Sequence, residues 1–222
     1  MAQAVKSLWP DVKLGIGPSI EDGFYYDFDK KEPFAPEDLE KIEAKMRELI
    51  AAGLPFVREE LSKKEARELF SALGETYKLE LIDAIPDEKV SIYRTGRDFV
   101  DLCRGPHVAQ TAEIKSFKLL SIAGAYWHGI ETNPMLQRIY GTAFDKAADL
   151  EKYLAVLEEA KKRDHRRLGK DLGLFDIYHE EAGSGLVFYH PGGAVLRNIL
   201  ETYEKQEHVR RGYEMVVTPH VL

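Results

Sequence analysis

The order of strand-like and helix-like patterns along the chain constrains its fold most. Two stretches rich in β-branched and aromatic residues, residues 13–20 and 23–28, flank a turn signal and predict two paired strands. Apolar residues then recur at helical spacing over residues 36–52, and Ser62 with Glu65 forms a capping box that opens a second helix. This arrangement predicts an α+β fold in which helices pack on a mixed or antiparallel sheet.

The rest of the chain continues with strands and then with helices. We expect strands near residues 77–81, 90–94, 99–103, 117–122 and 137–142. Helices are expected at the opening MAQAVKSLWP, over residues 145–168 and after Gly192-Gly193, with a short strand at residues 213–217 before Pro219. The composition shifts at Gly169, and we therefore divide the chain into residues 1–145, 146–172 and 173–222.

Composition and charge exclude several classes of protein. A single cysteine excludes an intramolecular disulfide framework, and no signal peptide or membrane-spanning apolar run is visible, which predicts a cytoplasmic protein without a membrane partner. The net charge of -7 argues against binding nucleic acid by bulk electrostatics. Six basic residues nevertheless fall within residues 161–170, where they can offset a helix dipole or contact a nucleic-acid backbone.

The stretch FVDLCRGPHV holds the only cysteine four residues before a histidine. Gly105-Pro106 between them argues against a helix, so we interpret the stretch as a strand that runs into a turn. Strand alternation places Asp101 and Cys103 side by side on one face, over which His107 can fold back. Arg104 can pair with a phosphate or a carboxylate.

Four interpretations of this stretch remain open from the residues alone. Cys103 and His107 can ligate zinc if a further ligand joins them, but no helical HxxxH occurs in the chain. They can form a nucleophile and its base, although the Asp101 carboxylate disfavours a thiolate. They can be an inert cysteine and a satisfied histidine, or they can join Asp101 in a polar site that binds substrate and orients a water.

Several segments resemble the editing domain of the bacterial threonyl-tRNA synthetase family, in the same order. These are MAQAVKSLWP, GIGPSIEDGFYYDF, GETYKLEL, and FVDLCRGPHV followed by FKLLSIAGAYWHGIETNPMLQRIYGTAF. RDHRRLGKDLGLFDIYHEEAGSGLVFYHPGG is similar to the family's linker helix and the entry to its class II catalytic domain, and RRGYEMVVTP to class II motif 1. The resemblance implies an editing domain (1–145), a linker helix (146–172) and the start of a catalytic domain (173–222), truncated at both ends.

The resemblance implies editing of a mischarged tRNA. Serine lacks one methyl of threonine, and a pocket rejects the smaller side chain by only ~1–3 kcal/mol, so hydrolysis of Ser-tRNA(Thr) at a second site adds the missing specificity. It implies tRNA(Thr) as partner, no cofactor in this chain, and ATP, magnesium, a catalytic-domain zinc and a homodimer in the full-length enzyme. A non-catalytic tRNA-binding fragment and a zinc-dependent deacylase of the alanyl type are the alternatives.

The resemblance also implies roles for individual residues. The catalytic set is His107, Lys78 and Cys103. The residues expected to bind substrate are Asp101, Arg104, Gln3, Tyr126 and Arg138; Tyr126, Arg138 and Trp127 can line the editing cleft and stack on the terminal adenine, or be core residues. The residues expected to contact tRNA are Lys161, Lys162, Arg163, Arg166 and Arg167. Gln3 aligns with the second histidine of the family's HxxxH pattern, and it can form hydrogen bonds but cannot transfer a proton near neutral pH.

Overall fold

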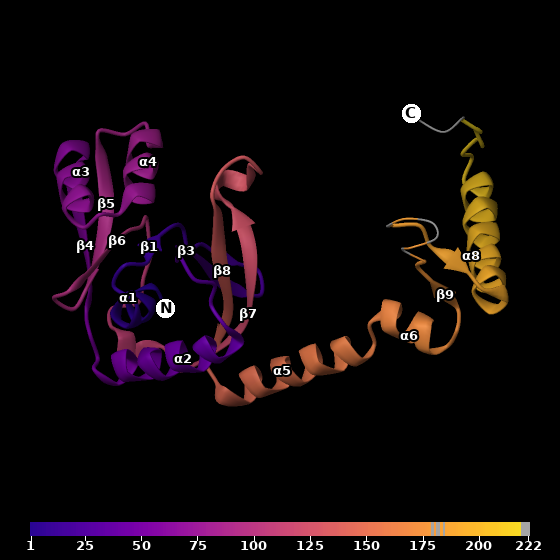
Figure 1. Ribbon diagram of the computed structural model, residues 1–222, viewed down its shortest axis with the longest axis horizontal. Coiled ribbons are helices and arrows are strands. Elements are labelled where there is room, and N and C mark those ends of the chain that lie inside the picture. The colour runs from indigo at the N-terminus through magenta and orange to yellow at the C-terminus, as the bar shows by residue number, and fades with distance from the viewer. Residues whose placement is uncertain (179, 181–182, 184, 219–222) are drawn as a thin grey trace. The chain divides into compact units, whose positions relative to one another are not determined.

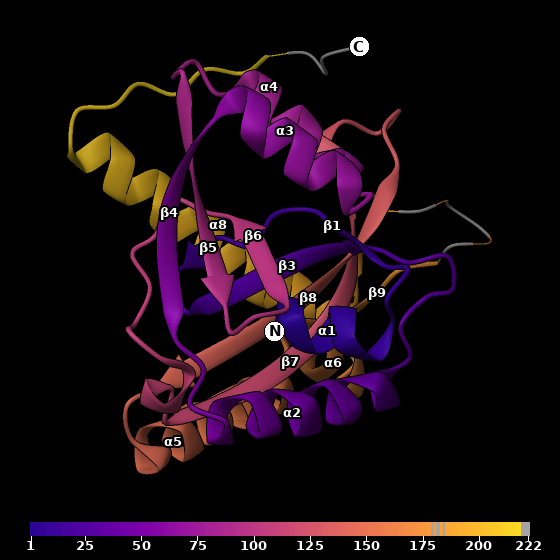
Figure 2. The same cartoon turned by 90° about the vertical axis from the view of Figure 1, so that its left-hand side faces the viewer.

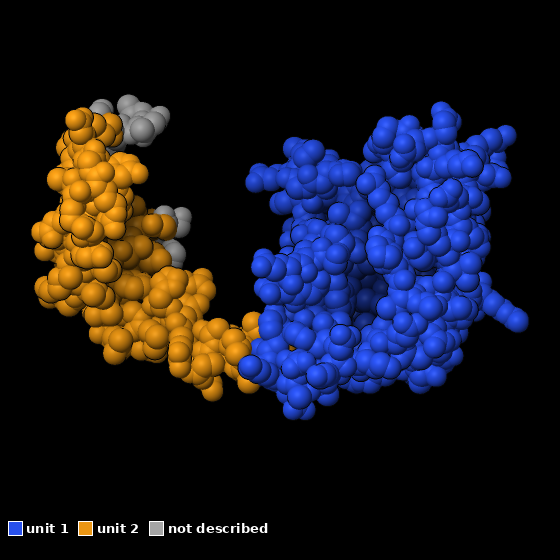
Figure 3. Space-filling view, turned by 180° about the vertical axis from the view of Figure 1, so that it is seen from behind, with its two compact units in different colours: residues 1–153 blue, residues 154–222 orange. Residues whose placement is uncertain are grey.

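The computed structural model describes residues 1–178, 180, 183 and 185–218. The chain forms two compact units, residues 1–153 and 154–222, which Figure 3 colours blue and orange. The break between them falls inside a helix, and the three-part division expected from the sequence stays a prediction. Within the described residues, no helix combines the length and the apolar character that crossing a membrane requires.

The first sheet of unit 1 is antiparallel, with the strand order β1-β3-β8-β7 and β2 paired beside β3. Its strands are β1 (Lys13–Leu14), β2 (Ser19–Ile20), β3 (Gly23–Asp29), β7 (Ser116–Tyr126) and β8 (Met135–Phe144). Helices α1 (Ala2–Leu8) and α2 (Pro36–Ala51) pack on one face, where Val5, Phe28, Ile42 and Ile139 are fully buried. Figure 1 shows α2 below this sheet, and Figure 2 shows α1 above α2.

A second, three-stranded antiparallel sheet lies in the same unit. It has the order β4 (Phe56–Ser62), β5 (Lys89–Thr95), β6 (Phe99–Leu102). Helices α3 (Lys63–Ala72) and α4 (Thr76–Ala84) pack beside it and bury Phe70, Ile82 and Ile92 between them (Figure 1). Two short turns of 3-10 helix, Thr111–Glu113 and Trp127–Gly129, lie in the connections on either side of β7.

The second unit is mainly helical. Helix α5 (Ala147–Lys162) begins in unit 1 and continues into unit 2, where α6 (His165–Asp171) follows it. The short strands β9 (Phe175–Asp176) and β10 (Phe188–Tyr189) pair antiparallel before α8 (Pro191–Arg210). Many apolar side chains of α8 are exposed, among them Val195, Ile199 and Tyr203.

The structure confirms the α+β fold with antiparallel sheets, but the predicted strand at residues 77–81 is wrong. This stretch is the core of α4, with Tyr77, Lys78 and Ile82 buried on more than one side. A short, largely apolar run does not distinguish strand from buried helix, and lysine, leucine and glutamate favour the helix. Gly74, at φ +71°, ends α3 and lets α4 start at a new angle.

Three further differences concern a split strand, a divided helix and a strand that was not predicted. The first expected strand is split into β1 and β2, because Gly15 to Pro18 form a loop between them. The expected helix over residues 145–168 is divided into α5 and α6, since Asp164 accepts a hydrogen bond from the Arg166 backbone at 2.8 Å and caps a new helix. The sequence did not predict β4, which holds the charged run Arg58, Glu59 and Glu60 and has no fully buried side chain.

The expected strand at residues 213–217 is also wrong. Residues 213–218 pair with no strand in the described part of the chain, and Val217 is 95% exposed. A strand with apolar side chains needs a partner for its backbone groups, and the described residues supply none here. Pro219 lies outside the described residues.

The capping box of α3 generates a stability prediction. Ser62 Oγ accepts from the Glu65 backbone N–H at 3.3 Å, and the Glu65 carboxylate accepts from the Ser62 N–H at 2.9 Å. Ser62→Ala should lower the free energy of unfolding by about 1 kcal/mol, measured by urea denaturation. Ser71→Ala on the same helix removes no cap and is the matched control; equal stability of the two variants would contradict the prediction.

Candidate functional site

Strand β6 divides its side chains between two environments, as its alternation predicted. Val100 and Leu102 pack against the cluster under α3, while Asp101 points the opposite way, toward β3 of the first sheet. There the Tyr26 hydroxyl donates a hydrogen bond to Asp101 Oδ2 at 2.5 Å. The two sheets of unit 1 are therefore joined by a polar contact at this point.

A buried lysine completes this contact. Lys78 Nζ from α4 donates to the Tyr26 hydroxyl at 2.9 Å and lies 2.5 Å from Asp101 Oδ1. The three side chains form a closed network, which we call the Lys78 network and define as Tyr26, Lys78 and Asp101. It joins one element from each sheet to a helix, so its members come from segments far apart in the sequence.

Burial sets the electrostatics of the Lys78 network. The Lys78 side chain is 2% exposed and that of Asp101 is 16% exposed, so each charge depends on the other for compensation. Burial, and then the Asp101 charge, raise the pKa of Tyr26 well above its ordinary value, which keeps its hydroxyl a hydrogen-bond donor. Asp101 Oδ1 is buried and, despite its short distance to Lys78, receives no well-aligned hydrogen bond.

Cys103 and His107 meet just beyond the end of β6. Cys103 Sγ lies 3.2 Å from His107 Nε2 and accepts from the Gly105 backbone N–H at 3.3 Å. The His107 ring stacks on Phe56, with centroids 5.1 Å apart, and meets the edge of Tyr93 at 4.4 Å. The turn therefore folds His107 back over the Cys103 face, as the sequence predicted, and aromatic contacts fix the ring.

Partial burial lowers the pKa of His107 below its ordinary value of 6.5, while the Asp101 charge acts in the opposite direction. The imidazole is therefore neutral at pH 7. A neutral ring has one nitrogen that accepts a proton, and the contact with Cys103 occupies Nε2. In the tautomer whose Nε2–H donates to Cys103 Sγ, Nδ1 is the nitrogen that can accept a proton, and the Asp101 carboxylate acts on this ring.

The remaining predicted residues of this region lie beside the site. Gln3 Nε2 donates to the Thr95 carbonyl at 3.4 Å, and Thr95 is the strand partner of Phe56, which stacks on His107. Gln3 is therefore held near the aromatic frame of His107. Arg104 is exposed and forms no ion pair with any residue that the structure describes.

The structure does not bring Arg138 and Tyr126 to the Lys78 network. Arg138 pairs through two hydrogen bonds, at 2.7 and 2.9 Å, with the buried Asp27 and stacks on Tyr25. Asp27 is the neighbour of Tyr26 on β3, so this pair lies on the opposite face of the sheet. Tyr126 is exposed at the end of β7, and their predicted contacts with a nucleotide stay predictions.

Trp127 is buried in the core. Its ring packs on Tyr77, with centroids 4.9 Å apart, and its Nε1 donates to Glu80 at 2.7 Å. An aromatic side chain beside strands is more often a core residue than a ligand contact, and its hydrogen-bond partner explains its burial.

The basic run lies across the break between α5 and α6, and most of its cations have acidic neighbours. Lys162 and Arg163 pair with Glu159, Arg166 with Asp164 and Arg167 with Asp171, whereas Lys161 has no ion pair with a described residue. All these cations are exposed, and such exposed pairs are weak and exchange readily with other partners. The predicted contact with tRNA stays a prediction.

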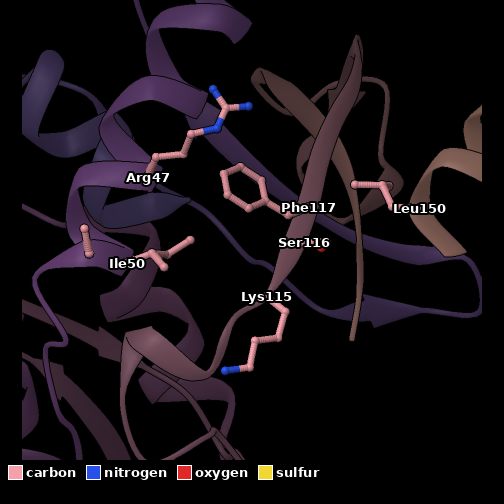
Figure 4. Close-up of a pocket in the computed structure, with 7 residues that line it drawn as sticks. Arg47, Ile50, Lys115, Ser116, Phe117 and Leu150 are labelled. Carbon is pink, nitrogen blue, oxygen red and sulfur yellow. The ribbon is translucent and has the colours of Figure 1, made fainter. Parts of the chain in front are cut away.

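A separate surface pocket of about 340 Å³ lies elsewhere in unit 1 (Figure 4). Phe117 lies in the middle of its lining, and Arg47 is 5.8 Å from that ring while it pairs with Glu43. The lining consists of Arg47, Ile50, Ala51, Lys115, Ser116, Phe117 and Leu150. It holds none of the predicted site residues, and so we take the region around Asp101 and His107 as the candidate site.

The described residues contain no group of three or more His, Cys, Asp or Glu side chains arranged to hold a metal ion. Cys103 and His107 therefore remain a pair. Tyr26 is the site residue that the sequence missed. Its polar hydroxyl on the inward face of an aromatic strand was the available signal, because a buried tyrosine hydroxyl needs a partner.

Comparison with known proteins matches the segment that contains part of the candidate site. Residues 90–140 match the family described as the threonyl and alanyl tRNA synthetase second additional domain. This segment covers β5, β6, the His107 turn, β7 and part of β8, and it includes Asp101, Cys103 and His107. This part of the chain is therefore similar to an additional domain of aminoacyl-tRNA synthetases.

The relatives that match the whole chain are threonine--tRNA ligases. The chain is 59% identical over 222 residues to that of Oleidesulfovibrio alaskensis, 60% to that of Citrifermentans bemidjiense, and 58% over 221 residues to that of Dehalococcoides mccartyi. It covers 34%, 35% and 37% of their lengths, about one third. The resemblance to the threonyl-tRNA synthetase family predicted from the sequence is confirmed.

The turn before His107 generates a prediction about Gly105. This residue has φ +76°, and a Cβ there would overlap the Tyr93 hydroxyl. Gly105→Ala should lower the free energy of unfolding by more than the ~1–2 kcal/mol of backbone strain alone and move the His107 ring, as NMR would report. Gly129→Ala, at φ +72° with open space around it, is the control that has backbone strain only. Equal losses in the two variants would contradict the steric role of Tyr93.

The charge environment of His107 generates a second prediction. In an NMR titration the pKa of His107 should lie below 6.5, because its burial disfavours the imidazolium form. Asp101→Asn should lower that pKa further, since the Asp101 charge raises it. Asp98→Asn, at an exposed position in the preceding turn, should leave it unchanged. An increase in the Asp101→Asn variant would contradict the proximity of the two groups.

Proposed function

We propose that residues 1–145 form an editing domain that hydrolyses mischarged Ser-tRNA(Thr), and that the chain acts as part of a threonine--tRNA ligase. The observation that carries the proposal is the arrangement on β6. One face presents Asp101, held by Lys78 and Tyr26, directly beside Cys103 and His107. This face combines a charged group for an aminoacyl moiety with a neutral imidazole for a water.

Asp101 is the group that recognises the amino acid in this proposal. Its carboxylate is partly exposed at the surface of the network, and the α-ammonium or the hydroxyl of a seryl group can donate a hydrogen bond to it. Packing around the serine hydroxyl excludes the additional methyl of threonine.

His107 and Lys78 take part in the hydrolysis. A water attacks the ester carbonyl carbon as His107 accepts a proton from it, and the bond to the ribose oxygen then breaks as that oxygen takes up a proton. The Lys78 ammonium stabilises the negative charge that develops on the reacting oxygen or the departing ribose oxygen. Cys103 holds the imidazole through its contact with Nε2.

The rest of the chain would serve the longer enzyme. Residues 146–172 form the linker helix, and residues 173–222 begin the class II catalytic domain with motif 1. On binding tRNA, the cations of the linker helix exchange their acidic neighbours for phosphates; these cations are Lys161, Lys162, Arg163, Arg166 and Arg167. ATP-dependent threonylation, magnesium, a zinc ion, a homodimer and a cytoplasmic location are proposed for the longer protein. The described residues hold no metal-ligand group that fits the two ions, and no step in this chain uses them.

Deacylation of Ser-tRNA(Thr), with Thr-tRNA(Thr) as the reference substrate, tests the proposal. We expect faster release of serine than of threonine, and a loss of about 10²-fold or more in kcat/KM for His107→Ala and Asp101→Asn. Asp98→Asn should retain the activity, because Asp98 is exposed outside the site.

Two outcomes would replace the proposal. Binding of tRNA without serine release above the spontaneous rate would support a non-catalytic tRNA-binding protein. Loss of activity on chelation, with recovery on addition of zinc, would support a zinc-dependent deacylase of the alanyl type.

A further inference from the structure

A second ion pair, between the buried Glu75 and the partly exposed Lys6, lies near the Lys78 network. Glu75 precedes α4 and is 2% exposed. Its Oε1 accepts a hydrogen bond from Lys6 Nζ at 2.6 Å, and its Oε2 accepts from the Leu14 backbone N–H at 2.7 Å. Lys6 also donates to the Val12 carbonyl at 2.7 Å. The Glu75 carboxylate thus connects α1, β1 and the first turn of α4.

Glu75 lies where it can affect both the position of Lys78 and the charge around it. Glu75 lies three residues before Lys78, and the Lys78 N–H donates to the Glu75 carbonyl at 3.1 Å. After burial and Asp101, the charge of Glu75 also contributes to raising the pKa of Tyr26, a member of the Lys78 network. A change in the position or charge of Glu75 therefore reaches Lys78 both through the helix backbone and through the local field.

We propose that Glu75 and Lys6 form a positioning pair that fixes the first turn of α4 and so holds the Lys78 ammonium against Tyr26 and Asp101. Its kinetic consequence rests on the proposed editing function, whereas its effect on Lys78 does not. Buried ion pairs contribute little net stability compared with apolar residues of similar volume, so stability alone does not account for the pair. The need to hold Lys78 in position accounts for the pair, because a displacement of about 1 Å at a reacting group costs about 10²-fold in rate.

The test compares the reactivity of the Lys78 amine in several variants. Trace acylation of the folded protein followed by mass spectrometry reports how often Lys78 Nζ leaves its partners. We expect Glu75→Gln and Lys6→Met to raise the acylation rate of Lys78 by about 10-fold or more, and Lys6→Arg, which keeps the pair, to stay close to the wild type.

Glu43→Gln is the matched control. Glu43 is also buried, accepts from a backbone N–H (that of Leu119, at 2.9 Å) and pairs with Lys118, but it joins α2 to β7 and not to α4. A purely structural role for Glu75 predicts equal increases of Lys78 acylation in Glu75→Gln and Glu43→Gln. That result, or an unchanged rate in Glu75→Gln, would overturn the proposal.

Deacylation kinetics supply the second readout. Glu75→Gln should lower kcat for Ser-tRNA(Thr) by about 10- to 100-fold with little change in KM, because the substrate contacts at Asp101 remain. If the wild type releases no serine, the editing function fails, and the acylation rates alone decide on the positioning pair. If Glu75→Gln does not fold, the contrast between Lys6→Met and Lys6→Arg decides, and equal acylation rates in these two would overturn the proposal.

Discussion

The ammonium group of Lys78 must have a counter-charge inside the protein, and this requirement fixes how unit 1 is assembled. An unpaired charge that is almost fully buried costs several kcal/mol, so α4 can dock only where its lysine meets Asp101 and Tyr26. Because Asp101 belongs to one sheet and Tyr26 to the other, the same contact sets the position of the two sheets. The chemistry of the candidate site and the packing of the domain thus depend on one network.

The second part of the site is held by different forces. His107 is fixed by stacking on Phe56, by the edge of Tyr93 and by its contact with Cys103, and its partial burial lowers its pKa. The charged network and the neutral histidine meet on one face of β6, where Asp101 and Cys103 are two residues apart. A carboxylate, an ammonium group and an imidazole are thus brought close together at the end of β6.

Local patterns predicted the parts of the site that depend on short spacing. The two-residue period of β6 placed Asp101 beside Cys103, and Gly105-Pro106 predicted the turn that brings back His107. Such patterns do not predict which side chains of the two sheets contact each other. The short, largely apolar run around Lys78 was interpreted as a strand, where tertiary packing selects a helix. Neither the role of Tyr26 nor the pairing of Arg138 with Asp27 follows from residue spacing. These depend on sheet register and on burial, which only the folded chain defines.

A double-mutant cycle on serine release tests most directly whether the charged groups act as one network. The kcat/KM for Ser-tRNA(Thr) would be measured for Lys78→Met, Asp101→Asn and the double variant. If the two residues act as a unit, the double variant should be no slower than the slower single variant, because either substitution already disables the shared network. Losses that multiply in the double variant would show that Lys78 and Asp101 act independently, and would contradict this account.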